Sequence, residues 1–200
     1  MAEPRRGRRR FIGWLAGVLA IAAATHVAAI QAYPRLVMGT AWNRLSEAAG
    51  PDGLIHAPRP DAASRTVVRP SPDLLYSVCV YDLEAGPWSV KTAIPKTYMS
   101  VSLYAMNTDN FFTINDQQID SGELRFIIVD GPVDDVRTTG RPLIVRSPTT
   151  RGIALFRYFA GGDVSDAAEI DSARRGLECG RAPQPAELGP SPRARSVSGD

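Results

Sequence analysis

The sequence predicts a mainly β protein: an antiparallel β-sandwich with one C-terminal helix, preceded by an N-terminal transmembrane helix. Three observations carry this prediction. An uncharged apolar run follows a cluster of arginines, alternating apolar runs separated by Gly and Pro fill the middle of the chain, and a helical apolar stripe comes after them. Period-two alternation between turn residues is typical of half-buried strands, whereas a 3.6-residue spacing is typical of an amphipathic helix.

The apolar run occupies residues 11–32 and contains no Asp, Glu, Lys or Arg. At about 1.5 Å per residue, a helix of this length reaches the roughly 30 Å of hydrocarbon in a bilayer. Arginines are dense before the run, and none follows until Arg35. The positive-inside rule therefore places the N-terminus in the cytoplasm and the rest of the chain across the membrane. We expect a single-pass protein of the bacterial inner membrane with a periplasmic domain.

Two other interpretations of this segment stay open. Small residues near Ala29 and Ala32 would suit a signal peptidase, in which case the segment is a cleaved signal peptide. Residues 8–12 also resemble the twin-arginine export core, although Gly7 stands where Ser or Thr is usual. The apolar length favours retention as an anchor.

The middle of the chain predicts a β-meander within residues 67–110. Its strands are 75–81, 88–94 and 98–105, with Gly86-Pro87 and Pro95-Lys96 in the gaps. We expect further strands at 111–114, 124–129, 143–146 and 152–159. A helical stripe then begins at Val164, and Gly180 is placed to end the helix.

These patterns divide the chain into five parts. Residues 1–10 form a basic cytoplasmic tail, 11–32 the anchor, 33–64 a membrane-proximal helix and linker, 65–179 the β-sandwich domain, and 180–200 a proline-containing tail that we expect to be disordered. Trp42 either lies at the membrane interface or fastens its helix to the domain. The linker, with Pro58 and Pro60, is expected to lift the domain off the bilayer.

Charge and residue content exclude several functions. Beyond Arg10 the chain has 18 basic and 20 acidic residues, whereas a nucleic-acid interface needs Lys and Arg clustered on the folded part. The histidines, His26 and His56, fall in the anchor and the linker. This placement leaves no imidazole in the predicted domain for a Ser-His or Cys-His nucleophile or a His-based zinc site. We expect no cofactor and no metal, and an enzymatic role is not favoured.

Three smaller features keep alternatives open. Cys79 and Cys179 could form a disulfide in an oxidising compartment. Alternatively they are unpaired, with Cys79 buried in a strand and Cys179 on the surface past the helix, and we favour this second interpretation. Asp73 and Asp82 are the carboxylates whose meeting would support acid–base catalysis. The Asn and Asp side chains of residues 107–120 carry oxygen atoms of the kind that binds Ca²⁺, but their spacing fits no EF-hand, and both residue types are common in turns. We therefore favour turns for these residues: Asn107, Asp109, Asn110, Asn115, Asp116 and Asp120.

Several short motifs together resemble the domain-of-unknown-function 1254 family. Members read approximately R-P-N-x-D-T-L-Y-S, followed by D-L, G-P, a proline and a Tyr-rich strand. Ser71 and Leu74 stand where that pattern has Asn and Thr, and the likeness extends over residues 67 to about 179. The matching residues here are Val68-Arg69-Pro70, Asp73, Leu75-Tyr76-Ser77, Asp82-Leu83, Gly86-Pro87, Ile94-Pro95, Tyr98-x-Ser100-Val101-x-Leu103, Thr108-Asp109-Asn110-Phe111, Val129-Asp130-Gly131-Pro132, Ser147-Pro148-Thr149, Arg157 and Asp163.

The resemblance implies a β-sandwich without an agreed activity, often joined to a companion, the domain-of-unknown-function 1214. Our first hypothesis is therefore a binding or assembly module for a separately encoded membrane protein that carries this companion domain. The alternative is an enzyme or receptor for a carbohydrate-like or anionic small molecule.

The ligand-binding residues of that alternative would be Arg69, Asp73, Tyr76, Asp82 and Tyr98. A structural ion pair or a capping Asp is the competing interpretation of Arg69 and Asp73. The competing interpretation of the aromatic residues is sheet core rather than pocket lining; these residues are Tyr76, Trp88, Tyr98 and Tyr104.

Overall fold

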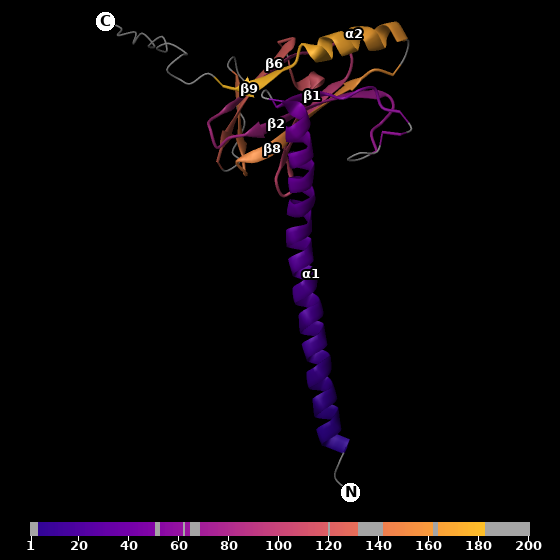
Figure 1. Cartoon of the computed structure of the whole chain (residues 1–200), viewed down its shortest axis with the longest axis vertical. Helices are drawn as coiled ribbons and strands as arrows, with labels where there is room; N and C mark the ends of the chain where they lie inside the picture. The colour runs from indigo at the N-terminus through magenta and orange to yellow at the C-terminus, as the bar shows by residue number, and fades with distance from the viewer. Residues whose placement is uncertain are drawn as a thin grey trace, which may run out of the picture.

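A computed structural model shows two packed β-sheets at the end of a long helix (Figure 1). The structure describes residues 4–50, 53–61, 63–64, 69–119, 121–131, 142–161 and 164–182. Within these residues the chain forms nine strands, two α-helices and one short 3-10 helix, η1 (Asp116–Gln118). The predicted fold class, a mainly β sandwich with a C-terminal helix behind a long apolar helix, is confirmed.

The two sheets differ in composition and direction. The first sheet has the order β1-β2-β8-β4-β5 and is antiparallel throughout; its strands are β1 (Leu54–His56), β2 (Leu74–Asp82), β8 (Arg151–Phe159), β4 (Met99–Ala105) and β5 (Asn110–Asn115). The second sheet has the order β7-β6-β3-β9, formed by β7 (Leu143–Ser147), β6 (Glu123–Asp130), β3 (Trp88–Ala93) and β9 (Glu178–Arg181). Its β6 and β7 run parallel, and its other pairs are antiparallel.

The predicted meander is wrong, although its three strands are present. β2 and β4 belong to the first sheet and β3 to the second, so the chain crosses between layers at both gaps. Neither gap contains the Asn-Gly or Asp-Gly turn that closes a two-residue hairpin. Strand β2 instead pairs with β8, where Leu74 lies opposite Phe159.

Inward-facing side chains of both sheets form one core, and two hydrogen bonds cross it. The Tyr81 hydroxyl on β2 lies 3.1 Å from the Ser147 hydroxyl on β7, and the Tyr158 hydroxyl on β8 lies 3.2 Å from Thr92 on β3. Both tyrosines are fully buried. These pairs satisfy the buried hydroxyls and fix the two sheets relative to each other.

A disulfide between Cys79 on β2 and Cys179 on β9 also joins the sheets. Our preference for unpaired cysteines was wrong. We expected the helix to continue to Gly180, but α2 (Val164–Arg175) ends earlier and the chain returns as β9 beside β3, where Cys179 lies opposite Val90. That return places Cys179 against the core position of Cys79.

The N-terminal helix α1 (Pro4–Ala49) is continuous through Pro34 and projects away from the sandwich (Figure 1). It is the described helix that is long and apolar enough to cross a membrane. Its apolar side chains are uncovered: Phe11 is 63% and Ile21 70% exposed. The buried residues of α1 lie in its last turns, at Met38 and Ala49.

Trp42 fastens this helix to the domain. Its ring lies 5.1 Å from the guanidinium carbon of Arg151 on β8, a cation–π distance. The first buried residue of α1, Met38, follows the predicted anchor by six residues, about 9 Å of helix. The sandwich therefore begins almost directly where the apolar segment ends.

The predicted linker begins with a strand, so that part of the prediction is wrong. The chain turns at Gly53, where a side chain would meet the Val80 carbonyl oxygen at 2.3 Å, and residues 54–56 then pair with β2. Three residues are too few for a periodic signal, which is why the strand escaped detection. The rest of the proposed division stays a prediction, and most of the expected disordered tail, 183–200, lies outside the described residues.

Candidate functional site

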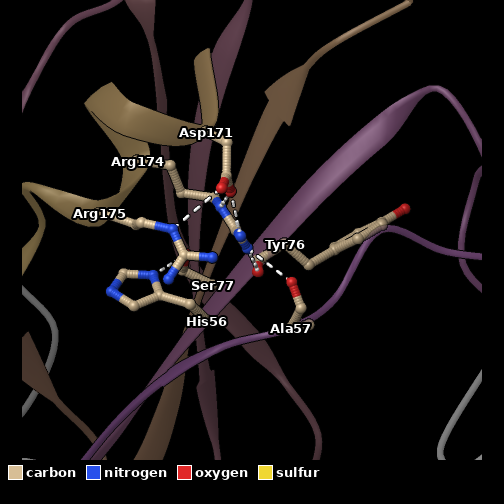
Figure 2. Close-up of polar contacts among 7 residues, drawn as sticks. All are labelled: His56, Ala57, Tyr76, Ser77, Asp171, Arg174 and Arg175. Carbon is tan, nitrogen blue, oxygen red and sulfur yellow. Dashed lines mark hydrogen bonds and ion pairs between the residues drawn. The ribbon is translucent and has the colours of Figure 1, made fainter. Parts of the chain in front are cut away.

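A buried arginine joins α2 to the β1–β2 edge (Figure 2). Arg174 is 2% exposed. Its Nη1 donates to the backbone carbonyls of Ala57, at 2.8 Å, and of Tyr76. Its Nε donates to Asp171 Oδ1 at 2.9 Å, and its Nη2 donates to the same carboxylate. We call Asp171, Arg174, Arg175, His56 and Ser77 the α2 cluster.

Asp171 is the carboxylate at the centre of this cluster. Its second oxygen accepts a hydrogen bond from Arg175 Nε at 2.9 Å. Partial burial acts to raise the pKa of Asp171, but the hydrogen bonds from Arg175 and Arg174 outweigh it and lower the pKa. The carboxylate therefore stays charged and compensates the buried guanidinium.

A histidine–serine pair completes the cluster. His56 Nδ1 lies 2.9 Å from the Ser77 hydroxyl. Burial, followed by the charges of Arg174 and Arg175, lowers the pKa of His56, while Asp171 acts in the opposite direction. The imidazole is therefore neutral at physiological pH, a state that can accept the serine proton. Our placement of His56 outside the fold was wrong, because β1 carries it into the sandwich.

This pair is nevertheless built as a structural contact and not as a nucleophile. Ser77 has no exposed surface, so an attacking hydroxyl would have no path to a substrate. Every other polar contact in the α2 cluster ends on a backbone carbonyl or on Asp171. The cluster therefore fastens α2 to the first sheet.

The predicted ligand residues separate into two groups at opposite ends of β2. Arg69, Asp73 and Tyr98 are exposed, and Tyr98 is 48% exposed. Main-chain hydrogen bonds from Ala160 to Asp73, and from Phe159 to Tyr98, bring Asp73 and Tyr98 to one end of the first sheet. No ion pair joins Arg69 to Asp73 within the described part of the chain.

Asp82 lies at the other end of the strand. Its carboxylate accepts a hydrogen bond from Arg151 Nε at 2.9 Å, beside the Trp42 contact with α1. Asp82 ends β2 nine positions after Asp73, about 30 Å of extended chain. The two carboxylates therefore cannot act on one substrate, and their proposed catalytic pairing is wrong.

The tyrosines do not form a shared pocket with Trp88. Trp88 is buried in the core and donates to Cys79 Sγ at 3.2 Å. Tyr76 faces the outer side of the first sheet, and its hydroxyl accepts a hydrogen bond from the Ser71 main chain at 2.9 Å. Figure 2 shows its ring pointing away from the α2 cluster.

The polar stretch that would have suited Ca²⁺ forms local turns. Asp109 and Asn107 hydrogen-bond each other, and Asp116 accepts a hydrogen bond from the Met99 main chain. Among the residues that the structure describes, no three His, Cys, Asp or Glu side chains are grouped to hold a metal ion. Asp120 lies outside the described residues.

The outer face of the second sheet carries a groove of about 410 Å³. We call it the outer groove; Lys91, Arg125, Ile127, Pro142 and Glu178 line it. Lys91 bridges Glu123 and Glu178 at 3.6 and 3.3 Å. Beside these ion pairs, Ile127 lies opposite Ile144, which is 55% exposed. Apolar and charged side chains thus share one open surface.

The chain matches the model of a protein family described as "Protein of unknown function (DUF1254)" over residues 51–181. It belongs to this family. The matched range includes β1 and ends with β9, so the family domain contains every described strand. No curated protein matches the chain.

Two solved structures are similar to this member of the family. The VPA0106 protein from Vibrio parahaemolyticus aligns with a TM-score of 0.57 at 15% identity, covering 84% of this chain and 40% of that protein. An uncharacterized protein from Burkholderia cenocepacia aligns with a TM-score of 0.40 at 16% identity, covering 80% of this chain and 42% of that one. The chain thus spans less than half the length of either protein. The first match shows a shared fold.

Sequence reasoning missed the α2 cluster. The spacing of Asp171, Arg174 and Arg175 was a usable signal, because side chains three and four residues apart on a helix are neighbours. The burial of Arg174 was not readable, because it depends on the backbone carbonyls of Ala57 and Tyr76, which lie far away in the sequence.

Proposed function

We propose that this protein is a single-pass inner-membrane protein whose periplasmic sandwich binds a companion domain through the outer groove. The observation that carries the proposal is the composition of that surface. A sheet with one face on the core and the other in water normally alternates apolar residues inside with polar residues outside. Here Ile127 and Ile144 lie opposite each other on the face where polar residues are expected. Next to them Lys91 forms ion pairs with Glu123 and Glu178.

The helix α1 supports the membrane part of the proposal. None of the described residues covers its apolar segment, and the segment follows a run of arginines that favours a cytoplasmic N-terminus. The disulfide supports the same orientation, since disulfides persist in the bacterial periplasm and are rare in the cytosol.

The contact between Trp42 and Arg151 gives the anchor a mechanical role. Because the last turns of α1 pack on the first sheet, the helix restricts the angle at which the sandwich sits on the bilayer. A restricted domain loses less orientational freedom on binding a second membrane protein. The outer groove lies on the second sheet and so stays clear of this helix contact.

The nature of the companion follows from the family resemblance, which implies a domain-of-unknown-function 1214 partner. The mixed surface also suits a protein partner better than a lipid. Interfaces between proteins combine an apolar centre with a polar rim. The outer groove has Ile127 beside Lys91 and Glu178, and the exposed Ile144 lies next to the groove, opposite Ile127.

Co-purification from native membranes in mild detergent tests the docking proposal. A wild-type chain should retain a companion in stoichiometric amount, and Ile144→Lys should lose it. Thr113→Lys places the same charge at an exposed position of β5 on the other sheet and should retain the companion. Absence of a stoichiometric companion from the wild-type sample, or its equal recovery with Ile144→Lys, would contradict the proposal.

The orientation has its own test. A periplasm-active phosphatase fused after Ala182 should be active, and both cysteines should resist alkylation until a reductant is added. An inactive fusion together with freely alkylated thiols would place the sandwich in the cytoplasm.

A further inference from the structure

The short strand β9 forms one wall of the outer groove. All four of its residues, Glu178–Arg181, line the groove. Gly180 on β9 lies opposite Ser89 on β3, and Ser89 lies opposite Ile127 on β6. These three residues therefore cross the outer face of the second sheet in one row, and the row ends at β9. The position of β9 consequently sets the width of the groove.

The non-covalent contacts that hold β9 in this wall are weak. Among the described strands, β9 pairs with β3 alone and lies at the edge of the sheet. Glu178 forms an ion pair with Lys91 at 3.3 Å, but the Glu178 side chain is 69% exposed, and exposed ion pairs contribute little. Arg181 Nη1 lies 3.5 Å from the Ala85 carbonyl oxygen, at the limit of a hydrogen bond. An edge strand with such contacts opens locally at low cost.

The disulfide adds a covalent hold at the middle of this wall. Cys179 lies in β9 and lines the groove, and its partner Cys79 lies on β2 of the first sheet. The chain has two cysteines in total, so no other disulfide within it can replace this one. Leu177, which is 3% exposed, fixes the residue just before β9 in the core. Breaking the disulfide therefore leaves the start of β9 in place and frees the rest of the strand from the first sheet.

The two cysteines of the bridge differ in their surroundings. Cys79 has no exposed surface, whereas Cys179 is partly exposed at the edge of the sheet. A thiolate from outside therefore reaches the bridge at Cys179 as β9 opens, and Cys79 is the sulfur that departs. The Trp88 indole N–H donates to Cys79 Sγ at 3.2 Å. Because a hydrogen bond to the charged form favours that form, this donor stabilises the departing thiolate.

We propose that the disulfide is a redox-sensitive clamp on the outer groove, and that reduction by a dithiol frees β9 and releases the companion. One thiolate of the dithiol attacks Cys179 Sγ, the S–S bond breaks, and Cys79 leaves as a thiolate that takes up a proton. The second thiol then attacks the mixed disulfide, which frees Cys179 and leaves the reductant as a disulfide. The protein gains the two electrons and two protons that the dithiol loses. This inference rests on the proposed function, because it regulates the same groove.

Hydrogen exchange of the full chain in detergent, with and without dithiothreitol, tests the clamp without any companion. The Ala182 amide donates to the Pro87 carbonyl oxygen at 2.9 Å, just past β9. This amide and the protected amides of β9 should exchange at least about tenfold faster after reduction. Strand β7, at the other edge of the same sheet, should exchange as before. Unchanged exchange in β9, or equally faster exchange in β7, would overturn the proposal.

Companion recovery tests the consequence for the groove. The oxidised wild type should retain the companion, dithiothreitol should release it, and reoxidation should restore it. The double variant Cys79→Ala/Cys179→Ala should lose the companion whether or not dithiothreitol is present, which controls for effects of the reductant on the companion. Equal recovery with the oxidised and reduced wild type would overturn the clamp and leave the docking proposal standing. Absence of the companion from the oxidised wild type would instead contradict the docking proposal, and hydrogen exchange would then decide on the clamp alone.

Glutathione, a monothiol, identifies the sulfur that is attacked and keeps the test decisive if the double variant does not fold. Incubation of the folded, oxidised wild type with glutathione should place the mixed disulfide on Cys179. Peptide mapping after acid quenching locates it. Glutathione on Cys79, or a bridge that reacts only after global unfolding in denaturant, would refute the attack at the edge of β9.

Discussion

Cys79 on β2 and Cys179 on β9 form a disulfide that joins the two sheets across 100 residues of sequence. The Trp88 indole donates to Cys79 Sγ at 3.2 Å, so the bridge is enclosed by a core aromatic residue. β9 is a four-residue strand at the edge of the second sheet, and the disulfide ties it to β2 of the first sheet. The same bridge connects the folding of the domain to the oxidising compartment that we propose for it.

The first prediction concerns this bridge. Replacing both cysteines by alanine should lower the free energy of unfolding by about 2–4 kcal/mol, because the unfolded chain regains the freedom of a long closed loop. Urea denaturation followed by tryptophan fluorescence measures the change. Equal stability of the variant and the oxidised wild type would contradict a stabilising role.

The second prediction concerns Asp171. In Asp171→Asn the buried Arg174 loses its charged partner, and we expect a loss of about 1–3 kcal/mol, below the range for fully buried pairs because the Asp171 side chain is 32% exposed. Glu123→Gln is the matched control, since Glu123 also contacts two cations but at the surface. Chemical denaturation should show a larger loss of unfolding free energy for Asp171→Asn than for Glu123→Gln. An equal loss of stability in Asp171→Asn and Glu123→Gln would show that the burial of Arg174 does not increase the cost of losing its charged partner.

A third prediction tests the close contact between Gly152 and Tyr81. An added Cβ at Gly152 would lie 2.1 Å from the Tyr81 hydroxyl and 2.5 Å from the Tyr104 carbonyl oxygen. Gly152→Ala should therefore cost about 3 kcal/mol of stability, since a buried ring and a backbone atom would both have to move. Gly180→Ala has open space around its Cβ and should be neutral in the same melting experiment. A neutral Gly152→Ala would refute the packing described for this part of the core.

The fourth prediction concerns His56 and pH. Its pKa in the folded protein lies below the unfolded value, because burial and the Arg174 and Arg175 charges disfavour protonation. The unfolded state therefore binds more protons, and stability should rise with pH through the region below about 6.5. The stabilisation should be lost as the pH falls toward the lowered pKa.

Denaturation at pH 5.5 and 7.5 measures this dependence. His56→Gln should reduce the difference between the two pH values, because glutamine does not titrate. The partial exposure of the imidazole limits the size of the effect. Greater stability of the wild type at pH 5.5 would have the wrong sign and would contradict the described surroundings of His56.

Strand positions were readable from local alternation, but strand partners were not. The alternation in β2, β4 and β8 marks each strand correctly, yet nothing local indicates that Leu74 pairs with Phe159 or that β3 belongs to the other sheet. The parallel pairing of β6 with β7 was equally invisible. Pairing is decided by contacts between distant segments, which a pattern within one segment does not contain.

The candidate site was predicted less well for the same reason. Tyr76 and Tyr98 looked like one group, but Tyr98 is exposed at a strand end whereas the Tyr76 hydroxyl is held by Ser71. Arg157 was visible only as part of a family resemblance. Its hydrogen bonds to Ser102 and Tyr104 on the neighbouring strand β4 require the sheet.

Intact-mass analysis of the chain purified from its native membranes tests the central claim, that α1 is retained as the anchor of an oxidised sandwich. The account predicts a detergent-dependent protein whose mass includes residues 11–32 and corresponds to the disulfide form of Cys79 and Cys179. A soluble protein whose mass lacks that segment would contradict it, because the helix that meets Arg151 through Trp42 would then be no anchor.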